Sequence, residues 1–330
     1  MDWSTRGLVK LPQCLICSKQ KLHKAAGPDG IQMEAFIYGS HRLHVYLSVL
    51  FNIFAKHGYI TSEFCRAVII PLVKNKNGNL TDVNNYRAIA ISNAISKLLE
   101  EIILKYLDSV DEADDYQFGF KKDFSTGTCT YAFKQTVQYY RQRGSLVFCC
   151  FIDFSKAFDN VNYWLLFCKL IDYNNSNTRL ISVRLLAYWH SHQEMFVSWH
   201  NCHSACFSVL NGVRQGGVLS PFFISCIYIR NLINDVVMSR SGCYIAGVCV
   251  NLLAYADDIV LLYPSWHGLQ KLLNIIEKAT VAIEMSFDTN KTVYMIANQF
   301  NRSRIVSECF PQLTLANVLC FSFQVLRTYY

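Results

Sequence analysis

Two adjacent aspartates, Asp257 and Asp258, interrupt two aliphatic runs in "NLLAYADDIVLLY", residues 251 to 263. The aliphatic runs predict buried strands, and the acids fall where a tight turn would join those strands into a hairpin. A third acid, Asp153, ends the strongly apolar run "LVFCCFID". Burying an unpaired carboxylate is costly, and grouped carboxylates also repel one another. A fold that keeps these three charges must therefore compensate them.

Divalent cations provide the best compensation for such a cluster. If the hairpin lies beside the strand that ends at Asp153, the three acids approach two Mg²⁺ ions from one side, and substrate phosphate completes the coordination. Two such ions suit displacement at phosphorus. The alternative is a solvated Asp-Asp turn, but ordinary turns use Gly, Asn or Pro, whereas Tyr255, Ala256 and Ile259 frame this one. The pattern favours a Mg²⁺ site, with Mn²⁺ as an alternative ion.

Length and composition restrict the class of protein but do not specify a function. The 330 residues suffice for one large domain or two ordinary ones, and 52% hydrophobic against 17% charged residues exclude disorder. We find no uncharged apolar run of about 18 residues and no apolar signal at the amino terminus. The chain is therefore expected to be intracellular, cytoplasmic or nuclear, without a membrane partner. The net charge of +7 is compatible with a polyanionic partner and does not establish one.

The 14 cysteines show no disulfide framework, so reduced thiols are expected. Two groups contain residue types that bind zinc: the lone pair Cys14 and Cys17, and the crowded set His200, Cys202, His203 and Cys206. Zinc needs four ligands that converge tetrahedrally, and neither spacing supplies them. Neither group is predicted to bind metal.

Hydrophobic spacing predicts an α+β fold. Strands are expected over residues 64–78 with a break at Pro71, 145–154 in the centre of a sheet, 203–213, 251–263 and 290–298. Helices are expected over residues 33–58, 94–110, 130–144, 163–171, 177–192, 220–237 and 267–285. Their irregular alternation indicates a mixed sheet with helices on one face.

Several ordered motifs resemble the reverse transcriptases of non-LTR (LINE-like, jockey-related) retrotransposons. The central three are "FIDFSKAFD", "NGVRQGGVLSP" and "YADD", and the flanking blocks include "HKAAGPDGIQMEAF", "NNYRAIAISNAISKLLE" and "YQFGFKKDFST". The resemblance extends over about residues 20 to 300. It implies an RNA-directed DNA polymerase that extends a DNA primer from deoxynucleoside triphosphates (dNTPs) on an RNA template.

The resemblance also implies a right-hand polymerase with fingers and a palm. The expected division is an N-terminal helical segment at 1–60, fingers at 61–145, a palm with a fingers insertion at 146–300, and a divergent tail at 301–330. The tail matches neither a primer-gripping hairpin nor a helical thumb, and no endonuclease precedes the palm. The thumb and endonuclease regions of a parent element are therefore expected to be missing.

Individual roles follow from matching positions in the family. Lys74 and Arg87 would grip the triphosphate, Phe158 would exclude a ribonucleotide 2′-hydroxyl, and Lys291 would protonate the leaving pyrophosphate. Each has an ordinary alternative: Phe158 as core packing, and the basic residues as solvated surface. The full implied set is catalytic Asp153, Asp257, Asp258 and Lys291; metal-binding Asp153, Asp257, Asp258 and the backbone carbonyl of Phe154; and substrate-binding Lys74, Arg87, Phe158, Gln215, Gly216 and Gly217.

Two other functions remain open at this level. One is an inactive or domesticated relic that binds nucleic acid without polymerising, and the other is a metal-dependent nuclease. Primer extension separates all three, because a polymerase lengthens the primer, a nuclease shortens it and a relic leaves it unchanged.

Overall fold

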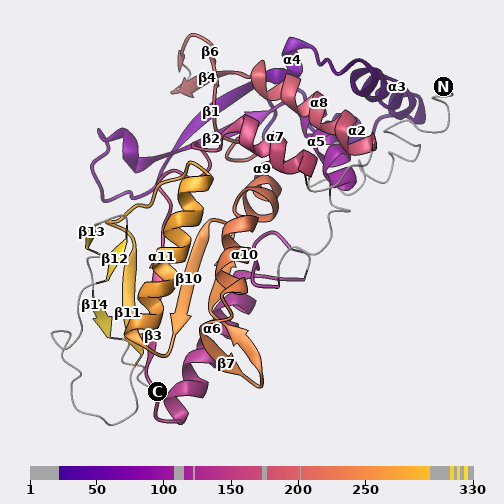
Figure 1. Cartoon of the computed structure of the whole chain (residues 1–330). Coiled ribbons are helices and arrows are strands. Elements are labelled where there is room, and N and C mark those ends of the chain that lie inside the picture. The colour runs from indigo at the N-terminus through magenta and orange to yellow at the C-terminus, as the bar shows by residue number, and fades with distance from the viewer. Residues whose placement is uncertain are drawn as a thin grey trace. The chain divides into compact units, whose positions relative to one another are not determined.

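The chain forms two compact units, each assembled from two separate stretches of sequence (Figure 1). The computed structural model describes residues 22–107, 115–121, 123–172, 177–200, 202–297, 313–315, 318–319 and 323–325. Unit 1 comprises Met1–Asp111 and Asn162–Ser220, and unit 2 comprises Glu112–Val161 and Pro221–Tyr330. No helix among the described residues is long and apolar enough to cross a membrane.

The helices of unit 1 follow the predicted periodicity, with one division. The segment expected as a single helix over 33–58 is split into α2 and α3. Helix α3 ends at Gly58 as predicted, because its φ of 64° terminates the helix. The Arg184 guanidinium donates to the carbonyls of Ala55 and Lys56, at 3.1 and 2.7 Å. The helices of unit 1 are α2 (Glu34–Ile37), α3 (His41–His57), α4 (Ser62–Cys65), α5 (Ala94–Leu107), α7 (Tyr163–Asp172), α8 (Asn177–Ser191) and the 3₁₀ turn η1 (Val83–Asn85).

The sheet of unit 1 has the order β2-β1-β4-β5, with β6 also paired to β4. The prediction that Pro71 breaks the strand is wrong: β1 continues through it, and Pro71 pairs with Ala88. Strand β4 pairs with β1 only as far as Ile69, so no β4 residue lies opposite the proline, which lacks an N–H donor. The single strand expected over 203–213 is replaced by two short strands, β5 and β6. The strands are β1 (Arg66–Val73), β2 (Tyr86–Ser92), β4 (Glu194–Trp199), β5 (Cys202–His203) and β6 (Phe207–Ser208).

The sheet of unit 2 has the order β14-β11-β3-β10-β9 and is mixed, because β14 runs parallel to β11 while the other pairs are antiparallel. Strand β3 is central, as its uninterrupted apolar sequence predicts. The strands are β3 (Val147–Ile152), β9 (Leu252–Tyr255), β10 (Asp258–Tyr263), β11 (Val293–Ala297) and β14 (Phe323–Val325). Two small ribbons are β7 (Cys243–Ile245) with β8 (Val248–Val250), and β12 (Thr314–Leu315) with β13 (Val318–Leu319).

Helices cover both faces of this sheet, so the expectation of helices on one face is wrong. The ring of Phe151 lies 5.6 Å from that of Phe133 in α6, whereas the ring of Phe148 lies 5.8 Å from that of Trp266 in α11. Alternate residues of a strand point to opposite faces, so these contacts are on opposite sides. A central strand with apolar residues on both faces needs helices on both sides of the sheet to bury them. The helices are α6 (Thr126–Gln142), α9 (Ser220–Phe222), the π-helical turn η2 (Phe223–Tyr228), α10 (Arg230–Met238) and α11 (Trp266–Ala282).

Candidate active site

The hairpin β9-β10 presents two aspartates at its tip, but they occupy different positions. Asp258 pairs with Tyr255, so the turn consists of only Ala256 and Asp257. Asp257 is thus the second turn residue, and Asp258 begins strand β10. The apolar residues on either side, expected to be buried strands, are buried.

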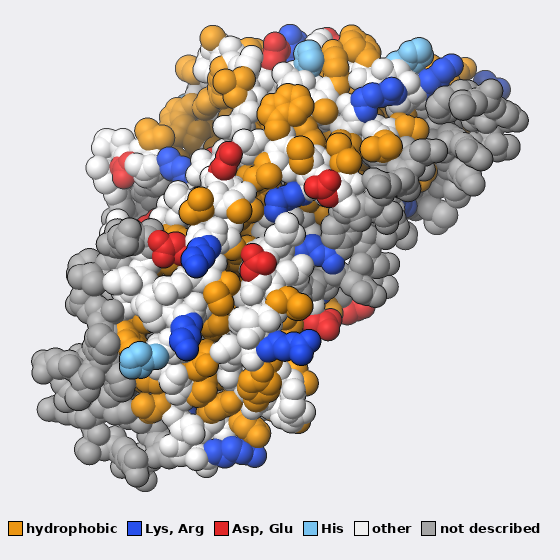
Figure 2. Space-filling view, viewed as in Figure 1, with side chains coloured by type: hydrophobic (Ala, Val, Ile, Leu, Met, Phe, Trp, Pro, Cys, Tyr) orange, Lys and Arg blue, Asp and Glu red, His pale blue; other side chains and the backbone are white. Residues whose placement is uncertain are grey.

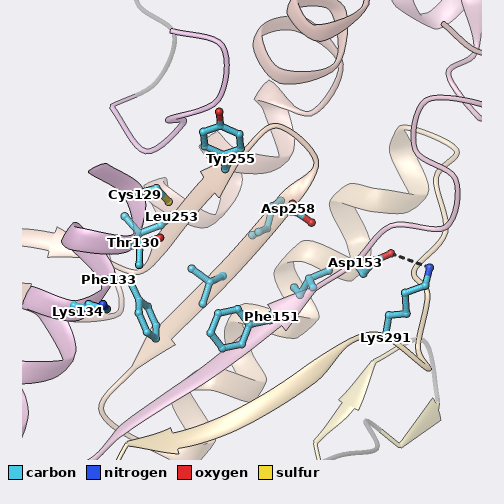
Figure 3. A pocket seen from close by; sticks show the side chains of 13 residues that line it. Cys129, Thr130, Phe133, Lys134, Phe151, Asp153, Leu253, Tyr255, Asp258 and Lys291 are labelled. Carbon is cyan, nitrogen blue, oxygen red and sulfur yellow. Dashed lines mark ion pairs between the residues drawn. The ribbon is translucent and has the colours of Figure 1, made fainter. Parts of the chain in front are cut away.

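Asp153 and Asp258 lie side by side at the end of neighbouring strands. In the antiparallel pairing of β3 with β10, the last partners are Ile152 and Ile259. Asp153 follows Ile152 and Asp258 precedes Ile259, so the two aspartates are the next residues at the same end of the pair. Residues opposite each other in such a pair point to the same face. Both aspartates accordingly line one pocket of about 480 Å³ between α6 and the sheet, shown in Figure 3.

The lining of the pocket combines apolar side chains with a few charged ones. Its apolar lining comes from α6 and from the strands beneath, including Cys129, Phe133, Phe151, Leu253 and Val260. Its charged groups are Asp153, Asp258, Lys134 and Lys291. Few polar groups in an otherwise apolar concavity are typical of ligand sites.

The three carboxylates repel one another. Burial raises the pKa of Asp258, and the charge of Asp153 raises it further. Burial also raises the pKa of Asp257, with further increases from Asp258 and Asp153. All three groups therefore lie within range of one another's charge, although roughly a hundred residues separate the first from the pair. This is the self-repelling cluster that the sequence predicts.

Lys291 is the cation beside this cluster. Its Nζ lies 2.6 Å from Asp288 Oδ2 and 3.7 Å from Asp153 Oδ1. The hydrogen bond to Asp288 raises the pKa of Lys291, and Asp153 adds to this effect, so the amine is held protonated. Its side chain is 63% exposed, lines the pocket and points toward Asp153 (Figure 3).

The backbone after β3 is fixed by the segment that precedes β11. The Asp288 amide donates to the Asp153 carbonyl and the Ser155 amide donates to the Ser286 carbonyl, both at 2.8 Å. Between them the buried ring of Phe154 stacks on Phe287 with centroids 5.3 Å apart. These two bonds do not engage the carbonyl of Phe154. Phe158 lies in the following turn with a partly exposed side chain, so it is not a fully buried core residue.

The other predicted substrate contacts lie in unit 1, along strand β2. Lys74 follows β1 and donates from Nζ to the Asn84 carbonyl at 2.9 Å, and the exposed Arg87 is in β2 itself. The Gln215 carbonyl accepts from the Ala90 amide at 2.8 Å. Gly216 has a φ of 114°, and a Cβ there would lie 2.8 Å from the Ala90 carbonyl oxygen. Only glycine fits this approach, and Gly217 follows it in the same loop.

A buried ion pair that sequence reasoning missed holds that loop in place. The side chains of Glu100 and Arg214 are 7% and 6% exposed, and Nη1 of the arginine lies 3.7 Å from Oε1 of the glutamate. Glu100 Oε2 accepts from the amides of Val218 and Leu219 at 2.6 and 3.2 Å. Burial raises the pKa of Glu100, and the charge of Arg214 opposes that rise. Glu100 could not be distinguished from the surface charges of an amphipathic helix by spacing alone.

The donor groups of the site limit how it could bind a cation. In the part of the chain that the structure describes, no three His, Cys, Asp or Glu side chains converge as a ligand set for one ion. The set His200, Cys202, His203 and Cys206 belongs to that part of the chain, whereas Cys14 and Cys17 lie outside the described residues. Mg²⁺ needs only one or two carboxylates when substrate phosphates and water complete its shell. Asp153 and Asp258 fit that requirement, and Asp257 lies nearby.

Basic side chains do not gather around one point on the face drawn in Figure 2. There Lys and Arg are scattered among hydrophobic, polar and acidic side chains.

Comparison with known proteins gives consistent relatives. Residues 73–313 match the reverse transcriptase (RNA-dependent DNA polymerase) family. The chain is 26% identical over 290 residues to "RNA-directed DNA polymerase from mobile element jockey" of Drosophila funebris, covering 84% of this chain and 30% of that protein. It is 25% identical over 289 residues to "Putative 115 kDa protein in type-1 retrotransposable element R1DM" of Drosophila melanogaster, covering 84% and 26%. A Pol polyprotein from element R2 of Nasonia vitripennis is 24% identical over 273 residues, covering 77% and 24%. The chain spans less than a third of the length of each of these relatives.

Proposed function

Because this chain belongs to the reverse transcriptase (RNA-dependent DNA polymerase) family, we propose that it extends a DNA primer from dNTPs on an RNA template as part of a non-LTR retrotransposon. The observation that carries the proposal is the placement of Asp153 and Asp258 next to each other at the end of two paired strands. Two adjacent carboxylates above a ligand-sized pocket are suited to nucleotidyl transfer.

Reverse transcriptase domains generally depend on a divalent metal. We propose that Asp153, Asp257, Asp258 and the carbonyl of Phe154 hold two Mg²⁺ ions, with Mn²⁺ as an alternative. The raised pKa values of Asp257 and Asp258 support this, because a cation would relieve the repulsion that causes part of them. When bound, the ions supply a lower pKa for the primer 3′-hydroxyl and neutralise charge on the triphosphate.

The remaining residues would bind and orient the substrate. Lys291, held protonated beside Asp153, would give its proton to the leaving pyrophosphate. The ring of Phe158 would stand against the 2′ position of the incoming sugar. Lys74 and Arg87 would donate to the triphosphate, and the loop of Gln215, Gly216 and Gly217 would lie along the nucleotide and template.

We assign the mixed sheet of unit 2 to the palm of a right-hand polymerase and unit 1 to the fingers. Under this assignment Asn162–Ser220 is an excursion from the palm into the fingers. The support is that all proposed metal ligands lie in unit 2, whereas Lys74, Arg87 and the loop at Gln215 lie in unit 1.

The direct test is primer extension by the 330-residue chain on poly(rA) with an oligo(dT) primer, dTTP and Mg²⁺. Lengthening of the primer that requires both template and dTTP is expected. Asp258→Asn provides the negative control because it removes a carboxylate while keeping the size of the side chain. Shortening of the primer would indicate a nuclease, and binding of the duplex without extension would indicate a relic.

A further inference from the structure

The turn that carries Asp257 has an unusual backbone. Ala256, the first turn residue, has a φ of 56° in the left-handed region and is 6% exposed. Two-residue hairpin turns usually place Gly, Asn or Asp at such a position, because other L-residues rarely adopt it. The surroundings of Ala256 must therefore hold this conformation.

The side chain of Gln117 holds Ala256 in this conformation through two hydrogen bonds. The Ala256 amide donates to Gln117 Oε1 at 2.9 Å, and Gln117 Nε2 donates to the Ala256 carbonyl at 3.1 Å. One amide group thus engages both polar backbone groups of a single turn residue, as a neighbouring strand would. Gln117 is 1% exposed, so water does not compete for these bonds.

The backbone around Gln117 is fastened to the same hairpin. The Phe118 amide donates to the Ala254 carbonyl and the Ala254 amide donates to the Tyr116 carbonyl, both at 2.8 Å. The Gly119 amide donates to Gln117 Oε1 at 2.8 Å and so helps to orient the side chain. A Cβ at Gly119 would lie 2.3 Å from the Ala256 nitrogen, so glycine is needed for this close approach.

We infer that Gln117 is a positioning residue for Asp257 and Asp258, acting by fixing the turn conformation at Ala256. The inference rests on the proposed function for its catalytic consequence. The clamp, meaning the two hydrogen bonds between the Gln117 side chain and the Ala256 backbone, is a property of the fold. Since Asp257 adjoins Ala256 and Asp258 begins the next strand, a change in the turn redirects both carboxylates relative to Asp153. Small misplacements of reacting groups have large effects on rate.

A matched control is available in the same unit. Asn251 is fully buried just before β9, at the opposite end of the hairpin from the turn, and its Nδ2 donates to the Val236 carbonyl at 2.8 Å. Gln117→Met and Asn251→Leu each remove one buried side-chain amide. Both should lower the urea midpoint, but only the first touches Ala256.

The first experiment needs no enzymatic activity. Hydrogen–deuterium exchange and Mn²⁺ binding, followed by the electron paramagnetic resonance of the free ion, are measured on the full chain. Gln117→Met is expected to speed exchange in the peptide that contains Ala256 and to weaken Mn²⁺ binding about tenfold, the usual effect of losing a supporting group behind a ligand. Gly119→Ala should act in the same direction. Equal effects from Asn251→Leu, or none from Gln117→Met, would overturn the inference.

The second experiment is a rescue. At saturating dTTP, Gln117→Met should slow single-nucleotide addition about 10- to 100-fold while the primer–template Kd changes less than about twofold. Adding Ala256→Gly should recover at least about threefold, because glycine adopts a positive φ without a clamp. Failure to recover would contradict the positioning role. If the unmodified chain extends no primer, the proposed function fails, and the exchange and Mn²⁺ measurements still decide on the clamp.

Discussion

The two units bury charge in opposite ways. In unit 1, Glu100 and Arg214 are opposite charges that meet each other and are further bonded to Val218, Leu219 and Gln193. In unit 2, Asp257 and Asp258 are like charges: burial raises the pKa of both, the charge of Asp153 raises both further, and Asp258 also raises that of Asp257. The first arrangement pairs opposite charges within the protein, although among the described residues Nη1 of Arg214 has no hydrogen-bond partner beyond this ion pair. The second leaves a negative charge that a bound cation can satisfy.

This contrast separates structural from functional burial of charge. A buried ion pair needs both members, because loss of one leaves the other uncompensated. A cluster of like charges loses repulsion when one member is removed. Substitution should therefore lower stability in unit 1 and lower activity in unit 2.

The largest expected effect is on catalysis. Asp258→Asn should reduce the rate of primer extension at least about 1000-fold, equivalent to roughly 4 kcal/mol of transition-state stabilisation, because a metal-binding carboxylate is lost. Without metal, the urea midpoint should stay constant or rise, since repulsion with Asp153 is removed. The two are measured by single-turnover kinetics and equilibrium unfolding. A variant that stays active but unfolds more readily would reverse the comparison.

The next effect is on stability. Glu100→Gln should lower the free energy of unfolding by about 3–5 kcal/mol in urea titrations, because Arg214 remains buried without its counter-charge. The double variant Glu100→Leu, Arg214→Met should recover part of that loss, because an apolar pair replaces the ionic one. A double variant that loses as much stability as Glu100→Leu and Arg214→Met lose together would mean that the backbone bonds to Val218 and Leu219 dominate.

A smaller effect concerns the cation. Mg²⁺ at about ten times its Kd should stabilise the wild-type chain by about 1.4 kcal/mol through binding to the folded state alone. Asp153→Asn with Asp258→Asn should lose this increment, and Glu100→Gln should retain it despite lower stability. The free energies are measured by urea unfolding with and without Mg²⁺. An equal increment in all three proteins would place the ion elsewhere.

The smallest effect involves a third way of burying a titratable group, which is to keep it neutral. The pKa of His190 is lowered from 6.5 to about 4, mainly by burial and also by the Arg214 charge, while the hydrogen bond to the Leu186 carbonyl opposes the shift. Because the unfolded chain binds the proton more readily, lowering the pH from about 6.5 to about 5.5 should lower the free energy of unfolding by about 1 kcal/mol. His190→Phe should flatten this slope in urea titrations. The exposed neighbour His192, changed to Gln, is the matched control.

Much of the site could be predicted from local sequence. The apolar runs around Asp153 and around Asp257 and Asp258 predicted strands, and strand period together with antiparallel pairing brings the acids together. The central place of β3 followed from its lack of polar positions. These features depend on residues close in sequence or on simple pairing rules.

Other features depend on partners that spacing cannot reveal. Pro71 continues a strand because β4 stops short of it, which depends on a segment more than a hundred residues later. Gln117 and Glu100 each lie in a recognisable motif, yet their buried contacts are with Ala256 and Arg214. The helices on both faces of the unit 2 sheet likewise depend on how α6 and α11 pack.

The register between β3 and β10 also has a consequence for how the chain folds. Asp153 meets Asp258 only after the intervening residues, including the Asn162–Ser220 part of unit 1, have been synthesised and the two strands have paired. Pairing across such a long loop is slow compared with helix formation. A slip of one residue would send the Asp258 side chain to the opposite face of the sheet. During synthesis, catalytic competence should thus appear late and abruptly, after most of the helices have already formed.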